Sequence, residues 1–308
     1  MRFIKHLIFL LLCSFLLASH SASAENLPKI RYFLQKENAV HSQTPYGNNL
    51  TSGHYVLAKD AKIYYESYGQ GEVVCVLHGG GVGSPYELGL VIDDLRKHFK
   101  VLVVSTRGHG RSEIGHEPLS YEQKARDVLA VLKDAGVTKC SLLGFSDGAY
   151  TAYKFAVMYP DLVERVIGIG AGTLKSHFFP KEISLEALAQ MDPKFVEQMQ
   201  KLAPEPKRLQ EFLSSYMQFW HELSVGQEIF ANIKCPVLLI CGDEDDHAPI
   251  KTVLAAHQLL PNSRLCVIPK AWHTAFLDNF PLTMLAIEQF LGSPVRTLSS
   301  SKKLDLNN

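Results

Sequence analysis

Gly144-Phe145-Ser146-Asp147-Gly148 sets the architecture expected for this 308-residue chain. The short apolar run 141–143 precedes this G-x-S-x-G sequence, and a helical pattern follows it until Pro160. A serine between two glycines at a strand-to-helix turn indicates a nucleophile on a strained bend, because only glycine lets the strand and the helix approach so closely. The pattern is short, so its context carries much of its weight.

Six short apolar runs predict strands that are covered on both faces, because the runs are continuous and, taken together, mostly β-branched. They are 73–77, 101–104, 141–143, 166–169, 237–240 and 265–268. Helical patterns such as 121–135 alternate with these runs, which predicts an α/β fold with a mostly parallel sheet and helices on both faces. Before them, 54–57 and 63–68 predict an antiparallel hairpin.

Residues 173–232 interrupt this alternation, because no strand pattern occurs there. Asp192-Pro193 is typical of an N-cap and first helical position, and an aromatic stripe with helical spacing follows Pro206. We interpret the segment as a helical cap. Trp220 of the stripe is a candidate for substrate binding, although packing onto the body is the simpler explanation for most of the stripe.

The N-terminal residues predict export. A basic start and the apolar run 7–18 precede Ala22-Ser23-Ala24, so residues 1–24 are typical of a signal peptide and predict a periplasmic or extracellular protein. A membrane anchor is the alternative, but the run is shorter than the roughly 17 to 25 residues of a span, and we expect no stable membrane insertion after cleavage. Residues 25–52 predict a surface arm, 53–293 the folded domain, and 294–308 a disordered tail.

Composition points to a small-molecule partner. Lys+Arg and Asp+Glu both number 31, so no net field attracts nucleic acid or anionic lipid. Five cysteines follow the predicted signal peptide, an odd number without Cys-x-x-Cys spacing, and each lies in or beside a predicted strand. We therefore expect buried free thiols, with no metal and no organic cofactor.

A serine hydroxyl is a weak nucleophile unless a histidine, oriented by an acid, removes its proton. The acids 243–246 follow the predicted strand 237–240, and His273 follows the predicted strand 265–268. Because parallel strands end at the same edge of a sheet, we expect these groups to converge on Ser146. The pattern leaves the choice among the four acids open, and His247 is an alternative to His273.

His78-Gly79-Gly80-Gly81 follows the predicted strand 73–77. Acyl transfer places negative charge on a carbonyl oxygen, and backbone N–H groups stabilise that charge when they already point at it. We predict an oxyanion hole made by the amides of Gly80 and Asp147, the latter at a helix N-terminus. A plain glycine turn is the alternative, whereas a phosphate loop would need a following Gly-Lys-Ser/Thr.

Together with Arg107 to Ser112 and the Gly242-x-x-Asp245 spacing, these motifs resemble the α/β-hydrolase superfamily over about residues 53 to 292. The resemblance implies the α/β-hydrolase fold, selects Asp245 as the acid beside His273, which its position already favours as the base, and makes 107–112 a structural loop. Ser105 stands where many members carry aspartate.

Gly-Phe-Ser-Asp-Gly is also similar to the motif of the biphenyl hydrolase-like, or valacyclovir hydrolase-like, group. That similarity implies that the Asp147 carboxylate contacts a substrate ammonium, because a carboxylate beside an oxyanion needs a cation or must turn away. The alternative is a first-turn acid that stabilises the helix dipole.

We therefore expect a serine hydrolase that cleaves a small carboxylic ester, with amine-bearing esters favoured. Ser146 attacks the acyl carbon, His273 transfers the proton, and Asp245 holds the imidazole tautomer. A peptidase or a thioesterase would use the same residues, and a noncatalytic ligand-binding protein with this fold is the alternative from another class.

Overall fold

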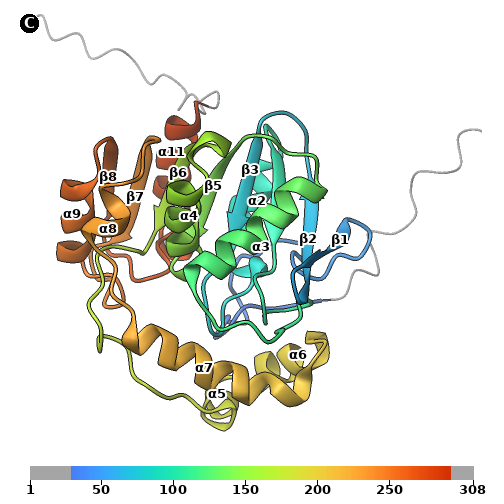
Figure 1. The fold of residues 1–308 in the computed structure, drawn as a ribbon. Helices are drawn as coiled ribbons and strands as arrows, with labels where there is room; N and C mark the ends of the chain where they lie inside the picture. The colour runs from blue at the N-terminus through green and yellow to red at the C-terminus, as the bar shows by residue number, and fades with distance from the viewer. Residues whose placement is uncertain (1–28, 293–308) are drawn as a thin grey trace, which may run out of the picture.

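The computed structural model describes residues 29–292, so the predicted signal peptide 1–24 and tail 294–308 lie outside the described residues. An eight-stranded sheet in the order β1-β2-β4-β3-β5-β6-β7-β8 forms the centre (Figure 1). β2 pairs antiparallel with β1 and β4, and the other strand pairs are parallel. The strands are β1 Gly53–Ala58, β2 Ala61–Tyr68, β3 Val73–Leu77, β4 Lys100–Val104, β5 Cys140–Phe145, β6 Val163–Ile169, β7 Val237–Gly242 and β8 Ser263–Ile268. The predicted mostly parallel sheet and its lead-in hairpin are confirmed.

Helices cover both faces of the sheet, and the strands supply apolar side chains to both. Successive strand residues point to opposite faces, so Cys75 and Leu77 of β3 pack in the core with α3, α4 and α9, whereas Val74 and Val76 pack with α2, α10 and α11. This double burial explains why the predicted strands are continuous apolar runs. The helices of the body, with two short 3₁₀ turns, are η1 Pro85–Leu88, α2 Gly89–Leu95, α3 Tyr121–Asp134, α4 Asp147–Met158, η2 Pro160–Leu162, α9 Ile250–Leu259, α10 Ala275–Asp278 and α11 Phe280–Leu291.

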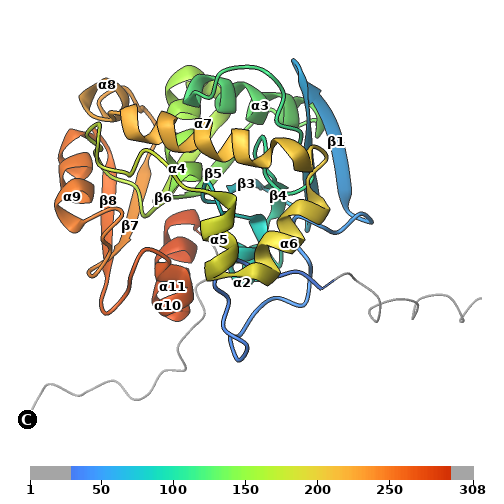
Figure 2. The ribbon, with the colours of Figure 1, turned by 90° about the horizontal axis from the view of Figure 1, so that it is seen from below.

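A group of helices inserted between β6 and β7 crosses one end of the sheet (Figure 2). They are α5 Leu185–Met191, α6 Pro193–Leu202, η3 Pro206–Arg208, α7 Leu209–Glu222 and α8 Gln227–Phe230. Asp192 caps α6 by accepting a hydrogen bond from the Phe195 amide at 3.1 Å, as predicted. An isolated antiparallel bridge between Leu174 and Val225 joins the two ends of the insertion, and α5 is a helix that the sequence pattern did not indicate.

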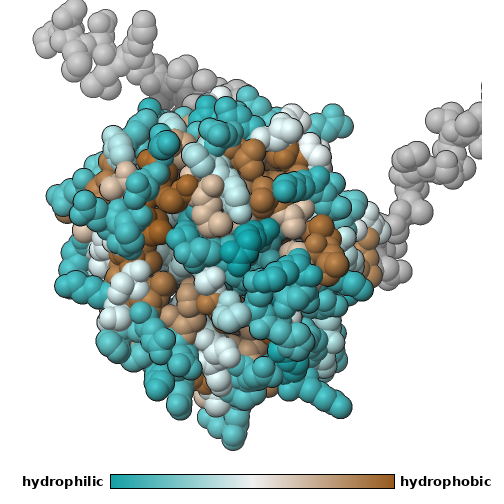
Figure 3. All heavy atoms as spheres, in the orientation of Figure 1, coloured by the Kyte–Doolittle hydropathy of each residue, from teal (hydrophilic) through white to brown (hydrophobic). Residues whose placement is uncertain are grey.

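The outward surface of the cap, at the bottom of Figure 3, is mainly hydrophilic, and hydrophobic residues on this face of the molecule gather in separate patches. Leu188, Leu213 and Tyr216 of the cap helices are buried instead. Within residues 29–292, no helix is both long enough and apolar enough to span a membrane.

The N-terminal arm differs from the surface arm that the sequence predicts, because part of it is buried against the body. Residues 29–52 contain no helix or strand, yet Tyr46 is fully buried and donates to Asp93 at 2.8 Å. Glu66 of β2 is also fully buried and accepts hydrogen bonds from the amides of Gly47 and Asn49 at 3.0 and 2.7 Å. A buried carboxylate needs such donors, which explains why the polar arm packs here.

The cysteines in residues 29–292 are all free, in line with the prediction. Cys75, Cys140 and Cys241 are buried, whereas Cys235 and Cys266 are only half-buried. Burial raises the pKa of the Cys140 thiol to about 12, so this thiol stays protonated and unreactive at neutral pH.

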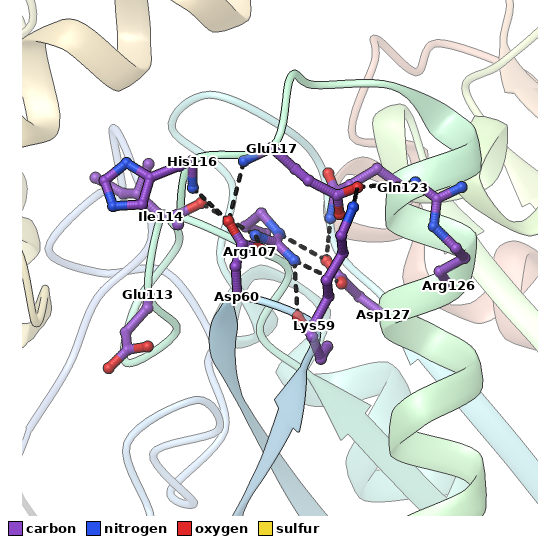
Figure 4. Close-up of polar contacts among 12 residues, drawn as sticks. Lys59, Asp60, Arg107, Glu113, Ile114, His116, Glu117, Gln123, Arg126 and Asp127 are labelled. Atoms are coloured by element: carbon purple, nitrogen blue, oxygen red, sulfur yellow. Dashed lines mark hydrogen bonds and ion pairs between the residues drawn. The ribbon is translucent and has the colours of Figure 1, made fainter.

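Arg107 joins three separate segments of the body (Figure 4). Its buried guanidinium makes two hydrogen bonds of 2.9 Å to Asp127 of α3, and it pairs with Asp60 of the β1–β2 turn at 2.6 Å. It also donates to the Ala58 carbonyl at 3.1 Å. The guanidinium therefore holds the hairpin, the loop after β4 and α3 together.

We expect Arg107→Met to lower the free energy of unfolding by about 3–5 kcal/mol, because it leaves the buried Asp127 carboxylate without its cation. The matched control is Arg126→Met, since Arg126 is half-exposed and its ion pair with Glu117, at 3.4 Å, is expected to contribute less than about 1 kcal/mol. Urea unfolding of both variants measures the difference. Equal losses of stability would contradict the anchoring role of Arg107.

Candidate active site

Ser146 lies at a strained turn between β5 and α4. Its φ of 51° and ψ of −116° are unusual for a residue with a side chain, and its amide donates to the Ile169 carbonyl at 2.8 Å. A Cβ atom on Gly144 would lie 2.3 Å from the Gly148 carbonyl oxygen, and one on Gly148 would lie 2.3 Å from the Leu77 carbonyl oxygen. The two glycines are therefore required by close packing of α4 on β5 and β3.

Asp245 holds the ring of His273 at the adjoining strand ends. The His273 Nδ1 atom lies 2.9 and 3.0 Å from the two Asp245 carboxylate oxygens. Asp245 is 4% exposed and also accepts hydrogen bonds from the amides of His247 and Ala248. Burial acts to raise the pKa of Asp245, but these hydrogen bonds outweigh burial and hold the pKa below its usual value. The carboxylate thus accepts the Nδ1 proton of His273 and leaves Nε2 available as a base.

Ser146 and His273 line the same cavity. No hydrogen bond joins their side chains in the described part of the chain. In enzymes without substrate, such catalytic hydrogen bonds are often long and tighten only when substrate is bound. The structure therefore brings Ser146 and His273 to one cavity, and the buried Asp245 is in direct contact with the histidine.

His247, the alternative base, has a different environment. Its ring stacks on that of His273 with centroids 4.8 Å apart and an interplanar angle of 24°, and its Nδ1 atom lies 2.7 Å from the Asp246 carboxylate. Donor atoms of Asp245, His247 and His273 come within 4.8 Å of one another, a spacing that could hold a metal ion. Because imidazole lone pairs lie in the ring plane, two nearly parallel rings do not aim at one point. The stack therefore disfavours a metal centre in this conformation, and His273 is favoured as the base because its carboxylate partner Asp245 is buried, whereas His247 and Asp246 are exposed.

The glycine turn after β3 is held by His78 and Glu87. The His78 Nδ1 atom lies 2.6 Å from the Gly79 carbonyl, and its Nε2 atom accepts the Thr106 amide at 3.0 Å, so the ring proton is on Nδ1. Glu87 accepts the Gly79 amide at 2.7 Å. Among residues 29–292, nothing accepts the amide protons of Gly80 or Asp147, and their role as the donors of the oxyanion hole stays a prediction.

The site lies at the carboxyl ends of β3, β5, β7 and β8. β3 lies between β4 and β5, so the chain turns to opposite sides of β3 at this point. Open α/β sheets bind ligands at such a switch point.

Comparisons with known proteins agree with this architecture. A family model described as alpha/beta hydrolase fold matches residues 72–208. The chain belongs to the α/β-hydrolase superfamily. It is 24% identical over 249 residues to the human protein "Serine hydrolase BPHL", covering 76% of this chain and 85% of that one.

Two further similarities lie among bacterial hydrolases. The chain is 27% identical over 252 residues to the 2-hydroxy-6-oxo-6-phenylhexa-2,4-dienoate hydrolase of Comamonas testosteroni, covering 70% of this chain and 86% of that one. Its fold is similar to a solved structure of the meta-cleavage product hydrolase from Pseudomonas fluorescens IP01, with a TM-score of 0.68 and 19% identity over 79% of this chain and 99% of that one.

In this α/β-hydrolase, the cation beside Asp147 comes from the protein. The Asp147 carboxylate is fully buried and pairs with the Lys124 ammonium at 2.6 Å. Burial acts to raise the pKa of Asp147, but Lys124 outweighs burial and holds the pKa below its usual value. The prediction that Asp147 contacts a substrate ammonium is therefore wrong for this conformation, because no substrate reaches the buried carboxylate and its charge is already balanced.

The carboxylate of Asp147 also fixes the cap over the nucleophile. Tyr121 of α3 and Trp220 of α7 each donate to its Oδ1 atom at 3.1 Å. Tyr216 of α7 lies 2.5 Å from the Lys124 ammonium, whose nitrogen is 4.3 Å from the centre of that ring. The aromatic stripe of the cap thus docks onto a buried ion pair next to Ser146.

Lys124 is the site residue that the sequence analysis missed. It lies three residues after Tyr121 and four before Val128, on the buried face of α3. A lysine on the apolar stripe of an amphipathic helix was the available signal, because a buried ammonium needs an acidic partner.

Two spaces of different size adjoin Ser146, His273 and Trp220. The wider one has a volume of about 650 Å³ and also contacts the glycine turn and the arm. The narrower one lies against Tyr150 and Phe179, with room of about 10 Å³, on the order of a single water molecule. Trp220 borders both spaces, which supports the proposal that it contacts substrate.

We expect Lys124→Met to lower the free energy of unfolding by about 3–5 kcal/mol, since it leaves the buried Asp147 carboxylate without its cation. The double variant Lys124→Met with Asp147→Asn should recover part of this loss, because the amide is neutral and its oxygen still accepts from Trp220. Chemical unfolding of both single variants and the double variant gives the coupling free energy. A double variant less stable than Lys124→Met would argue against the ion pair.

Glu87 gives the stability of the protein a pH dependence. Burial in the cavity wall raises the pKa of Glu87 from 4.5 to about 8, so the folded protein binds one more proton than the unfolded chain between these values. The stabilising contribution of the protonated carboxyl is complete below about pH 4.5 and is lost as the pH rises through 8. We therefore expect Glu87→Gln to gain stability relative to the wild type over this range, as measured by thermal unfolding at several pH values. The exposed control Glu186→Gln should follow the wild type at every pH, and parallel curves for Glu87→Gln would contradict the raised pKa.

Proposed function

We propose that this chain hydrolyses a small-molecule carboxylic ester through an acyl-enzyme intermediate. The observation that carries the proposal is the direct contact of His273 with buried Asp245 in the cavity of strained Ser146. A positioned acid, base and nucleophile form the arrangement that activates a serine hydroxyl.

In this mechanism, His273 Nε2 removes the Ser146 hydroxyl proton as the serine oxygen attacks the acyl carbon. The amides of Gly80 and Asp147 stabilise the oxyanion, and His273 then gives the proton to the departing alcohol. Water, deprotonated by His273, then attacks the acyl carbon, and His273 returns the proton to the Ser146 oxygen as the acid leaves. Asp245 stabilises the charged imidazole in both halves of the reaction.

The pairing of Asp147 with Lys124 removes the reason to favour amine-bearing esters. The proposal therefore covers neutral esters, and amino-acid esters should have no special advantage over esters of similar size.

A second candidate is hydrolysis of a carbon–carbon bond beside a ketone, which the names of the dienoate hydrolases among the relatives favour. The same serine, histidine and oxyanion donors would act on a ketone carbonyl. Loss of the absorbance of a 2-hydroxy-6-oxodienoate, followed next to ester hydrolysis, separates the two reactions.

We expect Ser146→Ala to abolish turnover of p-nitrophenyl acetate while the circular dichroism spectrum and the unfolding midpoint show a folded protein. A fluorophosphonate probe should label the wild type at Ser146 and leave Ser146→Ala unlabelled. Retained turnover in the variant would refute this nucleophile, and absence of labelling in the wild type would favour a noncatalytic binding protein.

A further inference from the structure

The N-terminal arm supplies one wall of the wide cavity. Tyr32, Phe33 and Leu34 of the arm line the same cavity as the catalytic residues, and Met191 at the end of α5 lines it from the cap. The volume of about 650 Å³ lies within the range of roughly 300–1,000 Å³ that is usual for ligand sites. The narrow space beside Ser146 holds on the order of one water molecule, so of these two spaces within residues 29–292 the wide cavity is the one that admits a bulky group.

The arm is attached to the cap at Asp192. One carboxylate oxygen of Asp192 accepts from Arg31 at 2.9 Å and from the Leu34 amide at 2.8 Å, while the other caps α6. Gln198 of α6 exchanges two hydrogen bonds of 2.8 Å with the backbone of Arg31. Figure 2 shows this N-terminal segment, in blue, passing beside α6. These contacts fix the arm in place at the cavity.

Leu34 carries the clearest sign of a functional position. Its φ of 59° is in the left-handed region, where a leucine is strained, and the hydrogen bond from its amide to Asp192 holds it there. Leu34 is nevertheless 51% exposed, and Met191 is 57% exposed. Two large apolar residues left open beside a catalytic cavity indicate a surface that an apolar ligand covers.

We propose that arm residues 32–34 and Met191 are the specificity-determining wall of the substrate cavity, and that the preferred substrate is an ester with one bulky, apolar substituent. The inference rests on the proposed ester hydrolysis. The arm and the cap bind the bulky substituent, while the groups at Ser146 perform the chemistry. Esters with two small substituents do not contact this wall, so they gain no binding free energy from covering it.

The test compares three esters: ethyl acetate, with two small groups, ethyl phenylacetate, with a bulky acyl group, and p-nitrophenyl acetate, with a bulky alcohol group. The ratio of variant to wild-type kcat/KM cancels the intrinsic reactivity of each ester. Leu34→Asn makes the wall polar and keeps a residue that tolerates positive φ, and Met191→Gln makes the same change on the cap at nearly constant size. Val40→Asn is the matched control, because Val40 is a 78% exposed residue of the arm that does not line the cavity.

We expect Leu34→Asn and Met191→Gln each to lower kcat/KM roughly tenfold for at least one bulky ester relative to ethyl acetate, mainly through KM, since about half the burial of one large apolar side chain is lost. Val40→Asn should leave all three ratios at one. Equal losses for all three esters, or no loss for either bulky ester, would overturn the proposal. Failure of the wild type to react with a fluorophosphonate at Ser146 is a separate result that contradicts the proposed function itself.

Discussion

The close approach of α4 to the carboxyl ends of β5 and β3 is the constraint on which the site depends. Gly144 and Gly148 permit it, since a single added carbon at either position would lie 2.3 Å from a backbone oxygen. The approach forces Ser146 to a positive φ and places its hydroxyl at the sheet edge. It also brings the Asp147 amide, at the start of α4, near the glycine turn that follows β3. One packing contact thus arranges both the nucleophile and the groups that would stabilise the oxyanion.

A second constraint follows from the residue after the nucleophile. Asp147 begins α4, where a negative charge is favourable, but its carboxylate is fully buried and needs a cation. Lys124 supplies that cation from α3, and the tyrosine and tryptophan of α7 complete the hydrogen bonds. The position of the cap is therefore coupled to the first turn after Ser146. A side chain on Gly80 would collide with the same Tyr216 and Trp220, so the cap and the glycine turn fit closely together.

The arm extends this arrangement outward. Asp192 caps α6 and binds the arm with the same carboxylate, so the wall of the cavity and the start of a cap helix share one side chain. The body provides the reactive groups. The arm before β1, the glycine turn after β3 and the cap together provide the shape of the cavity. This division is consistent with a fold in which one catalytic edge serves many substrates through variable surrounding segments.

The sequence was sufficient for the sheet, for the Ser146 turn and for an acid and a histidine at the same sheet edge, whereas the choice of Asp245 among the four acids 243–246 came from the family resemblance. These features have local signatures: double burial gives continuous apolar runs, steric crowding demands glycine on both sides of the serine, and parallel strands deliver their following residues to one edge. The partner of Asp147 and the wall formed by the arm required the folded structure. Lys124 is 23 residues from Asp147 and Arg31 is 161 residues from Asp192. No local pattern links residues so far apart, because their contact arises from the packing of α3, α7 and the arm around the site rather than from the conformation of any one segment.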